Sequence, residues 1–343
     1  MRYVSITYLR DQEFLTGQYD ISTIWPEPCQ IESSCLSVSS MRFIAAMDRS
    51  SHIKGLLITF SAVVILSPDA LLVRLIHCDV WSLLFWRCLF TGSMQGLFLA
   101  IAYRRQFLQS FRNIGRVGLF SAAIVTTGSF LFVNALRHTA AANVLIILAA
   151  TPLFSSLLSW LFLRENIARR TWLAILTCFG GILVIFSGSL QSGLLLGDLL
   201  ALGATLMWAG NLVVLRKGKA VNMVPANLLG NLMVVPIALL AGAQPFSVSP
   251  TDMTYLLLLG GILLPVSFTL ITVGPRHLPA PEISLILLTE TILGPIWVWL
   301  ALNEVPQATT LLAGALIVTT LALHTFMSLW TLRSHKLTAK SAV

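Results

Sequence analysis

Two stretches of the chain, 139 residues apart, decide the fold: RHTAAANVLIILAATPLFSSLLSWLFLRE (Arg137–Glu165) and RHLPAPEISLILLTETILGPIWVWLALNE (Arg276–Glu304). They align without a gap, so that Trp160 falls on Trp299 near the end of each stretch. Each contains an apolar run of about 20 residues, the length that a helix needs to cross the hydrocarbon core of a bilayer. The pair therefore predicts an internal duplication whose repeating unit crosses a membrane.

The composition of the 343-residue chain is that of a membrane protein. Hydrophobic residues make up 56% and charged residues only 10%, whereas soluble domains carry about 25% charged residues. The connections between apolar runs are short, which leaves no room for a soluble catalytic domain. We expect transmembrane helices at residues 55–75, 80–102, 115–136, 140–163, 171–188, 197–215, 222–243, 253–274, 280–302 and 308–330.

The repeat sets the expected domain organisation. The first helices of the two halves also align, with Gly55 on Gly197. Five helices per half is an odd number, so the second half enters the membrane from the opposite side. We predict an all-α integral membrane protein of ten transmembrane helices in two inverted five-helix repeats. The expected parts are a flexible polar tail (1–50), a first repeat (51–189), a second repeat (190–330) and a cytoplasmic basic tail (331–343).

The distribution of positive charge predicts the orientation. The net charge is +8, and clusters such as Arg104–Arg105 and Arg169–Arg170 follow alternate helices, which places these ends and both termini in the cytoplasm. The sequence has no basic face with interleaved aromatic residues, so we do not expect nucleic acid as a partner. The five cysteines have neither a C-x-x-C pair nor a histidine at zinc-ligand spacing, so we expect no metal and no cofactor.

Three ionisable residues fall inside the predicted spans: Asp69, Arg87 and Glu290. Such a residue at the centre of a span costs about 2.5–3.5 kcal/mol on insertion scales, so each requires a partner, a cavity or a function. Asp69 and Arg87 lie at matching depths, about 9–10 Å from the outer ends of their helices, and we predict that they pair. Two interpretations stay open for this pair: a static link between the first two helices, or part of a functional site.

The repeat also matches polar residues with one another: Asp69 with Asn211, Asn143 with Glu282, and Thr151 with Glu290. Spacing of i, i+4 places Asn143 and Thr151 on one helix face, and we expect this face to point at a common cavity. Tryptophans near these residues are expected as walls of the same cavity. The candidate site for substrate or coupling ion comprises Asp69, Arg87, Asn143, Thr151, Trp208, Asn211, Glu282, Glu290 and Trp297.

Glu290 has two interpretations. It lies about 13 Å along its helix, near the middle of the bilayer, where a carboxyl group is suited to bind substrate or carry a proton. The alternative is a neutral carboxyl group that is hydrogen-bonded between helices. The glutamates that end the two aligned stretches, Glu165 and Glu304, are expected to brace the following helix. Kinks are expected at the prolines inside spans, which are Pro68, Pro152, Pro236, Pro265 and Pro295.

The segments AATPLFSSLLSWLFLRE (Ala149–Glu165) and LLTETILGPIWVWLALNE (Leu287–Glu304), the first followed by a helix with Gly180-Gly181, resemble the EamA domain of the drug/metabolite transporter superfamily. The resemblance covers about residues 55–330. It implies a bacterial inner-membrane permease, commonly an exporter of amino acids, other metabolites or toxic compounds. The long polar N-terminal extension departs from this pattern. The intramembrane acids Asp69 and Glu290 are not expected in every member, and members are not uniformly proton-driven.

We therefore interpret the chain as a small-molecule transporter that works by alternating access, with proton coupling as one option. The expected partners are a small-molecule substrate and membrane lipid, and the oligomeric state does not follow from the sequence. The alternative is a membrane-embedded enzyme that acts on a lipid-like substrate, but the chain has no H-E-x-x-H, aspartate-rich or Cys/His motif. A channel or a non-catalytic scaffold also stays open.

Overall fold

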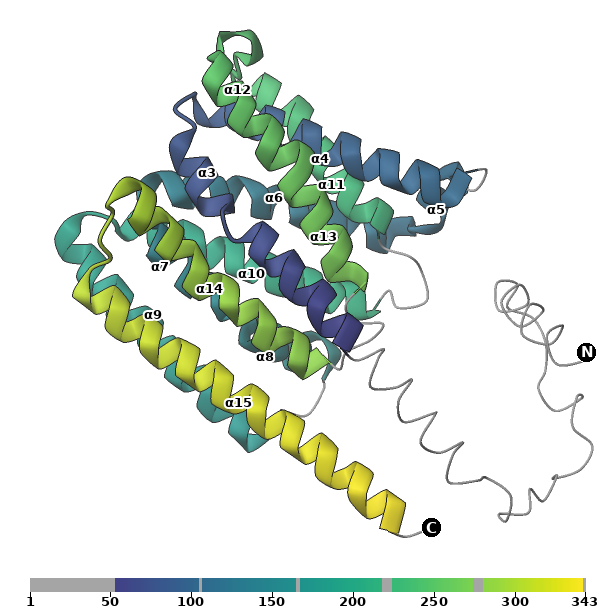
Figure 1. The fold of residues 1–343 in the computed structure, drawn as a ribbon, viewed down its shortest axis with the longest axis vertical. Helices are drawn as coiled ribbons and strands as arrows, with labels where there is room; N and C mark the ends of the chain where they lie inside the picture. The colour runs from purple at the N-terminus through teal and green to yellow at the C-terminus, as the bar shows by residue number, and fades with distance from the viewer. Residues whose placement is uncertain (1–52, 105–106, 165–166, 218–223, 274–279, 342–343) are drawn as a thin grey trace, which may run out of the picture. The chain divides into compact units, whose positions relative to one another are not determined.

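The computed structural model describes residues 53–104, 107–164, 167–217, 224–273 and 280–341. Within these ranges the chain is helical and contains no strand (Figure 1). The predicted N-terminal tail (1–50) lies outside the described residues, as do the last two residues of the chain.

The first span runs from Ile53 to Leu75 and breaks at Ser67-Pro68, where α3 (Asp69–Leu75) begins. The other elements follow in order: α4 (Val80–Tyr103), α5 (Phe107–Asn113), α6 (Gly115–His138), α7 (Ala141–Ala149), α8 (Thr151–Leu163), α9 (Arg169–Ser192), α10 (Leu195–Lys217), α11 (Val224–Leu240), η3 (Pro245–Ser247), α12 (Pro250–Leu256), the π-helical η4 (Leu257–Leu263), α13 (Leu264–Val273), α14 (Ala280–Leu302) and α15 (Ala308–Ser341).

The described residues contain seven helices that are long and apolar enough to cross a membrane. An eighth span is present if α7 and α8, which bend by 43° where they meet, form one broken span. Two shorter apolar helices are α11 and residues 286–302 of α14. Ten spans and the inversion of the halves stay predictions.

Local sequence explains several helix ends. Asp79 caps α4, because its carboxylate accepts hydrogen bonds from the backbone N–H groups of Trp81 and Ser82. Gly193 ends α9 in the left-handed conformation, with φ +74°. The last helix continues to Ser341 rather than ending at the predicted residue 330, since the basic tail contains no proline or glycine to stop it.

The prolines behave in different ways. Pro68 falls in the break before α3, and Pro152 lies in the first turn of α8, where its missing N–H has no helical partner in any case. The expected kinks at these two prolines are confirmed. By contrast, α11 and α14 continue through Pro236 and Pro295. Pro265 lies just after the π-helical segment.

The most extensive helix contacts join the two predicted halves. In particular, α6 packs on α10 and α11, α4 packs on α11, and α9 packs on α15, as the neighbouring ribbons of α9 and α15 show in Figure 1. Further contacts join α7 to α14 and α8 to α10. The buried apolar core is therefore shared between the halves, and each half depends on the other for burial.

Glycine allows the closest of these approaches. A Cβ atom on Gly260 in η4 would lie 2.7 Å from the backbone oxygen of Arg87 in α4 and 3.0 Å from Cβ of Phe90. A Cβ atom on the neighbouring Gly261 would meet nothing within 4 Å. The glycine at position 260 is therefore required by packing beside Arg87.

We predict that Gly260→Ala lowers the free energy of unfolding by about 1–3 kcal/mol, the usual cost of overpacking. The matched control Gly261→Ala is expected to be neutral or stabilising, because alanine is the better helix former. Thermal unfolding of the two purified variants in one detergent measures the difference. Equal melting temperatures would contradict the predicted close approach.

Candidate functional site

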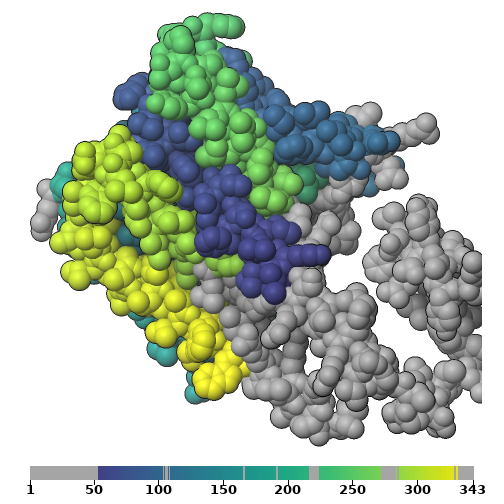
Figure 2. Space-filling view, in the orientation of Figure 1, coloured from purple at the N-terminus to yellow at the C-terminus, as the bar shows by residue number. Residues whose placement is uncertain are grey.

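A cavity of about 360 Å³ lies among the first span, α4, α6, α7, α8, α10, α13 and α14. On the face shown in Figure 2, the first span (purple) lies between the segment of residues 250–273 (green) and α14 (yellow-green). Because its lining residues come from these helices, the cavity has walls from both predicted halves. The cavity is lined mainly by apolar side chains, and its polar lining residues are Asp69, Arg87, Thr151, Asn211, Glu290 and Thr291, with Trp208 among the aromatic ones.

The predicted pairing of Asp69 with Arg87 is confirmed. Nη2 of Arg87 donates to both carboxylate oxygens of Asp69, at 3.1 and 2.9 Å, and only 8% of Asp69 and 7% of Arg87 is exposed. The guanidinium also lies over the ring of Phe132, 5.5 Å from its centroid. Asp69 is the first residue of α3, so the positive end of the helix dipole further stabilises the carboxylate.

Among the described residues, Glu290 is the acidic residue of the cavity that has no partner. It is partly buried on α14 and lines the cavity. Within the part of the chain that the structure describes, its carboxyl group makes no hydrogen bond and no ion pair. The interpretation as a carboxyl group hydrogen-bonded between helices therefore has no support among these residues. A free carboxyl group in a cavity can bind a proton, a cation or a hydrogen-bond donor.

Two repeat-related pairs meet at this cavity. Asp69 and its counterpart Asn211 both line it, as do Glu290 and its counterpart Thr151. The neutral members are held by their neighbours, since Asn211 accepts a hydrogen bond of 2.6 Å from Ser121 and the hydroxyl of Thr151 donates to the carbonyl of Leu148. The acidic members, Asp69 and Glu290, come from helices of different predicted halves.

Two described candidate residues, Asn143 and Trp297, do not belong to this lining. Asn143 is buried on α7 and bonds to Asp198, Ser189 and Thr310 instead. The helix of Asn143 ends at Ala149 and meets α8 at the 43° bend. Asn143 and Thr151 therefore lie on different helices and have different neighbours, although their spacing in the sequence predicted a shared face.

Trp297 is partly exposed, and its indole N–H donates to the hydroxyl of Ser67 at 2.9 Å, beside the break in the first span. It braces that break rather than forming a wall of the cavity. Glu282 falls within α14, but its side chain lies outside the described residues.

A dense polar cluster closes one end of the body, and we call it the polar end: Arg74, Arg137, Thr139, Asn143, Ser189, Asp198, Asp252, Glu304 and Thr310. Its centre is Asp198, which is fully buried and accepts hydrogen bonds from Thr139 (2.6 Å), Asn143 (3.0 Å) and Ser189. Asp198 does not stand out in the sequence, because an acidic residue at the start of a helix has the pattern of an ordinary cap.

Glu304 joins the two predicted halves at the polar end. Its Oε1 accepts from Nη2 of Arg74 at 3.2 Å and from the backbone N–H of Ala141 at 3.2 Å. It therefore braces α3 and the start of α7, which corrects the expectation that it braces the following helix. Glu165, its counterpart in the repeat, lies outside the described residues.

Cys78, in the connection between α3 and α4, lies at the same end. Burial, and next the negative charge of Asp252, raise the pKa of its thiol to about 11. At neutral pH the group is a thiol rather than the reactive thiolate. Among the described residues, no group of three or more histidine, cysteine, aspartate or glutamate side chains is placed to hold a metal ion.

Many apolar helices, each long enough for a bilayer, around a cavity with a few charged groups define a multi-pass membrane protein. The chain belongs to the EamA-like transporter family, whose sequence profile matches residues 53–187 and 195–326. This confirms the resemblance to EamA-domain members of the drug/metabolite transporter superfamily. The family consists of transporters of small molecules and not of enzymes, so the alternative of a membrane-embedded enzyme is not favoured.

A solved structure described as "Crystal structure of protein" has the same fold, with a TM-score of 0.60 and 18% sequence identity. The match covers 80% of this chain and 98% of the other. At this identity the likeness concerns the fold alone. No curated protein shows significant sequence similarity to the chain.

The ion pair generates a prediction on stability. Removing one partner of a buried pair costs about 3–5 kcal/mol, whereas replacing both by apolar residues is often neutral. Asp69→Leu and Arg87→Met should therefore each lower the melting temperature of the purified protein more than the double variant does. A double variant that melts at or below either single variant would contradict this.

Proposed function

We propose that the protein transports a small metabolite, amino acid or drug-like compound, most simply outward across a bacterial inner membrane, by alternating access of the cavity around Asp69, Arg87 and Glu290. One observation carries the proposal: a cavity that lies between helices of both repeats contains a paired and an unpaired charge in an otherwise apolar lining. Inverted repeats around a shared site are the architecture in which one half rocks against the other.

The cavity supports a small substrate. Its volume of about 360 Å³ lies near the lower end of the roughly 300–1,000 Å³ of ligand pockets. Trp208, Phe132 and Phe268 supply flat apolar walls, while Glu290 and the Asp69–Arg87 pair supply charge. A compact molecule with one apolar and one polar part matches this lining better than a long or fully apolar one.

The distribution of contacts supports a state that is closed at the polar end. There, the Arg74–Glu304 ion pair and the hydrogen bonds of Asp198 and Asn143 join helices of both halves. The cavity instead reaches residues such as Ile271, two residues from the end of α13. That end faces the cytoplasm in the proposed topology of ten spans, inverted halves and cytoplasmic termini, so the described conformation is taken as open to the inside.

Glu290 is proposed to couple transport to protons or to bind a cationic group of the substrate. The motivation is its position, because it is a carboxyl group inside a membrane span that has no partner among the described residues and faces the cavity. By contrast, Asp69 is neutralised by Arg87. A proton or cation that binds in the cavity would therefore be attracted to Glu290 rather than to the pair.

The first test is a ligand screen. Amino acids, nucleosides and cationic drugs are compared for saturable thermal stabilisation of the purified protein, since only a ligand that prefers the folded state raises its stability. The best compound then serves as radiolabelled substrate in proteoliposomes. If no compound in these classes both stabilises the protein and is transported, the proposed substrate classes are wrong.

We predict that Glu290→Gln abolishes the dependence of transport on an imposed pH gradient, because glutamine cannot take up or release a proton. Glu290→Asp is the matched control, which keeps the carboxyl group and should keep the pH dependence. Initial rates in proteoliposomes with and without the gradient measure both. Unchanged pH dependence in Glu290→Gln would rule out coupling through this residue.

We further predict that Glu304→Ala opens the polar end. The substitution removes the ion pair with Arg74 and the hydrogen bond to Ala141, so a cysteine placed in the cavity by Asn211→Cys should react faster with a membrane-impermeant maleimide added to whole cells. Replacing the native cysteines by serine beforehand removes the background labelling.

The control for this experiment is Asp79→Asn, which alters the cap of α4 and removes no ion pair between the halves. Its labelling rate is expected to equal that of the parent. If Glu304→Ala and Asp79→Asn give the same rate, the ion pair does not hold the polar end closed.

A further inference from the structure

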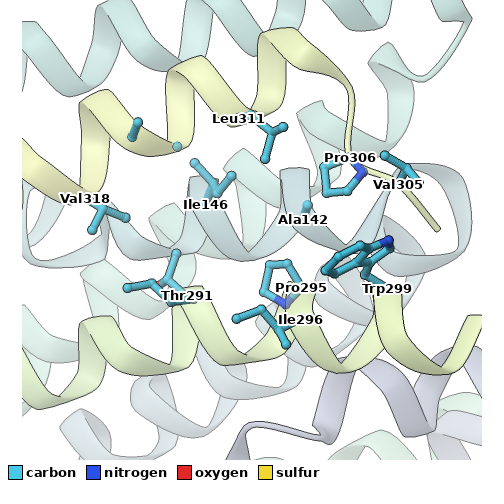
Figure 3. Close-up of a pocket in the computed structure, with 13 residues that line it drawn as sticks. Ala142, Ile146, Thr291, Pro295, Ile296, Trp299, Val305, Pro306, Leu311 and Val318 are labelled. Atoms are coloured by element: carbon cyan, nitrogen blue, oxygen red, sulfur yellow. The ribbon is translucent and has the colours of Figure 1, made fainter. Parts of the chain in front are cut away.

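A second cavity, of about 500 Å³, lies between α7, α14 and α15, and of its described lining residues it shares Thr291 with the cavity described above. Figure 3 shows its lining: Ile146 projects between α14 and α15, Trp299 and Pro306 close one end, and Thr291 and Val318 lie at the other. Of the described residues that line it, Thr291 has the one polar aliphatic side chain, and none is charged. The space is therefore an apolar groove, which we call the α14–α15 groove.

The groove has a buried floor and an exposed rim. Ala142 and Ile146 of α7 form part of the floor and are 5% and 6% exposed. The rim carries Ile296, Trp299 and Leu311, of which 39%, 50% and 57% is exposed. Because α14 and α15 belong to a membrane-spanning body, an apolar rim on their outward faces contacts lipid and not water. The groove opens sideways into the bilayer.

We expect an apolar groove of this size to be neither empty nor filled with water. Protein interiors hold few voids larger than a water molecule, because an unfilled space forfeits dispersion contacts. A water molecule needs two to four polar partners, and the lining supplies only the hydroxyl of Thr291 and, at the rim, the indole N–H of Trp299. With an empty groove and water both unfavourable, the hydrocarbon chains of the surrounding lipid are the material available to fill it.

The groove has the length of part of one extended hydrocarbon chain. The groove follows α15 from Leu311 to Val318 and α14 from Thr291 to Trp299, which are about 10 and 12 Å along the helix axes. Its long axis is thus parallel to the helices, as lipid chains are. Trp299, near the end of α14, lies where an aromatic side chain meets the headgroup region.

We propose that the α14–α15 groove is a binding site for one acyl chain of a membrane phospholipid. Close packing shapes the floor, because a Cβ atom on Gly314 would lie 2.7 Å from Cδ1 of Ile146. The bound chain fills the space that α7 leaves between α14 and α15. This site is inferred independently of the proposed transport function.

The groove adjoins the central cavity through a single residue. Thr291 lines both spaces, and it directly follows Glu290 in α14. The acyl chain therefore packs against one side of α14 while Glu290 faces the cavity on another. A chain in the groove restricts movement of α14 toward α15, and lipid occupancy consequently affects the element that carries the unpaired carboxyl group.

The test uses Ala315→Phe, which places a ring in the groove, and Leu323→Phe as control, on the same helix at a lipid-exposed position outside the lining. Delipidated proteins are titrated with palmitoyl-oleoyl phosphatidylethanolamine, and the melting temperature is followed. The parent and Leu323→Phe should show saturable stabilisation by the lipid. Ala315→Phe should melt higher than the parent without lipid, since the groove is filled, and gain several-fold less on lipid addition.

A second measurement locates the chain. The proteins are reconstituted with a phospholipid that carries a photoreactive diazirine on its acyl chain, and cross-linked peptides are mapped. Peptides of residues 291–299 and 311–318 should dominate in the parent and be depleted in Ala315→Phe. Cross-links spread evenly over all lipid-facing helices, or equal lipid stabilisation of parent and Ala315→Phe, would overturn the proposal. If Ala315→Phe fails to fold, Ala315→Leu serves in both measurements, because its side chain is smaller.

Discussion

The structure depends on one constraint, which is that a charged side chain within the hydrocarbon core needs an internal partner or a polar cavity. Arg87 satisfies it through Asp69 and the ring of Phe132. The buried Asp198 satisfies it through hydroxyl and amide donors from α7, from α9 and from the connection between α6 and α7. Glu290 is the exception among the described acidic residues of the core, since it faces the cavity without a partner. The carboxyl group of Glu290 is therefore the group in the cavity that is available to bind a proton or a cationic group of a ligand.

The same constraint explains why the halves pack so closely on each other. The Arg74–Glu304 pair joins the first span to the end of α14, and Asn143 bridges α7 to α10 and α15. These bonds lie at one end of the helices, whereas the cavity extends toward the other. Polar contacts at one end can exchange for contacts at the opposite end, and a rocking motion of the halves requires such an exchange. An apolar interface alone would give no preference for a closed end.

Much of the fold followed from the sequence, because apolar length and repetition are strong signals. Their ionisable side chains within predicted spans identified Asp69 and Glu290, and the repeat added Asn211 and Thr151. All four line the cavity, and matching depth predicted the Asp69–Arg87 pair. Helical periodicity gives the face of a residue but not its neighbours. For that reason Asn143 was assigned to the cavity although its partners are Asp198 and Thr310. Nothing in the sequence marked the α14–α15 groove, because a groove results from the packing of three helices.

The most direct test of the central claim, that this cavity works by alternating access, is counterflow in proteoliposomes. Vesicles are loaded with a high concentration of the unlabelled compound found by thermal stabilisation, and a trace of the labelled compound is added outside. A carrier that exposes its site to one side at a time predicts a transient accumulation of label above the external concentration, and Glu290→Gln should change its rate. Label that only equilibrates, with a flux that does not saturate, would contradict the account and indicate a channel.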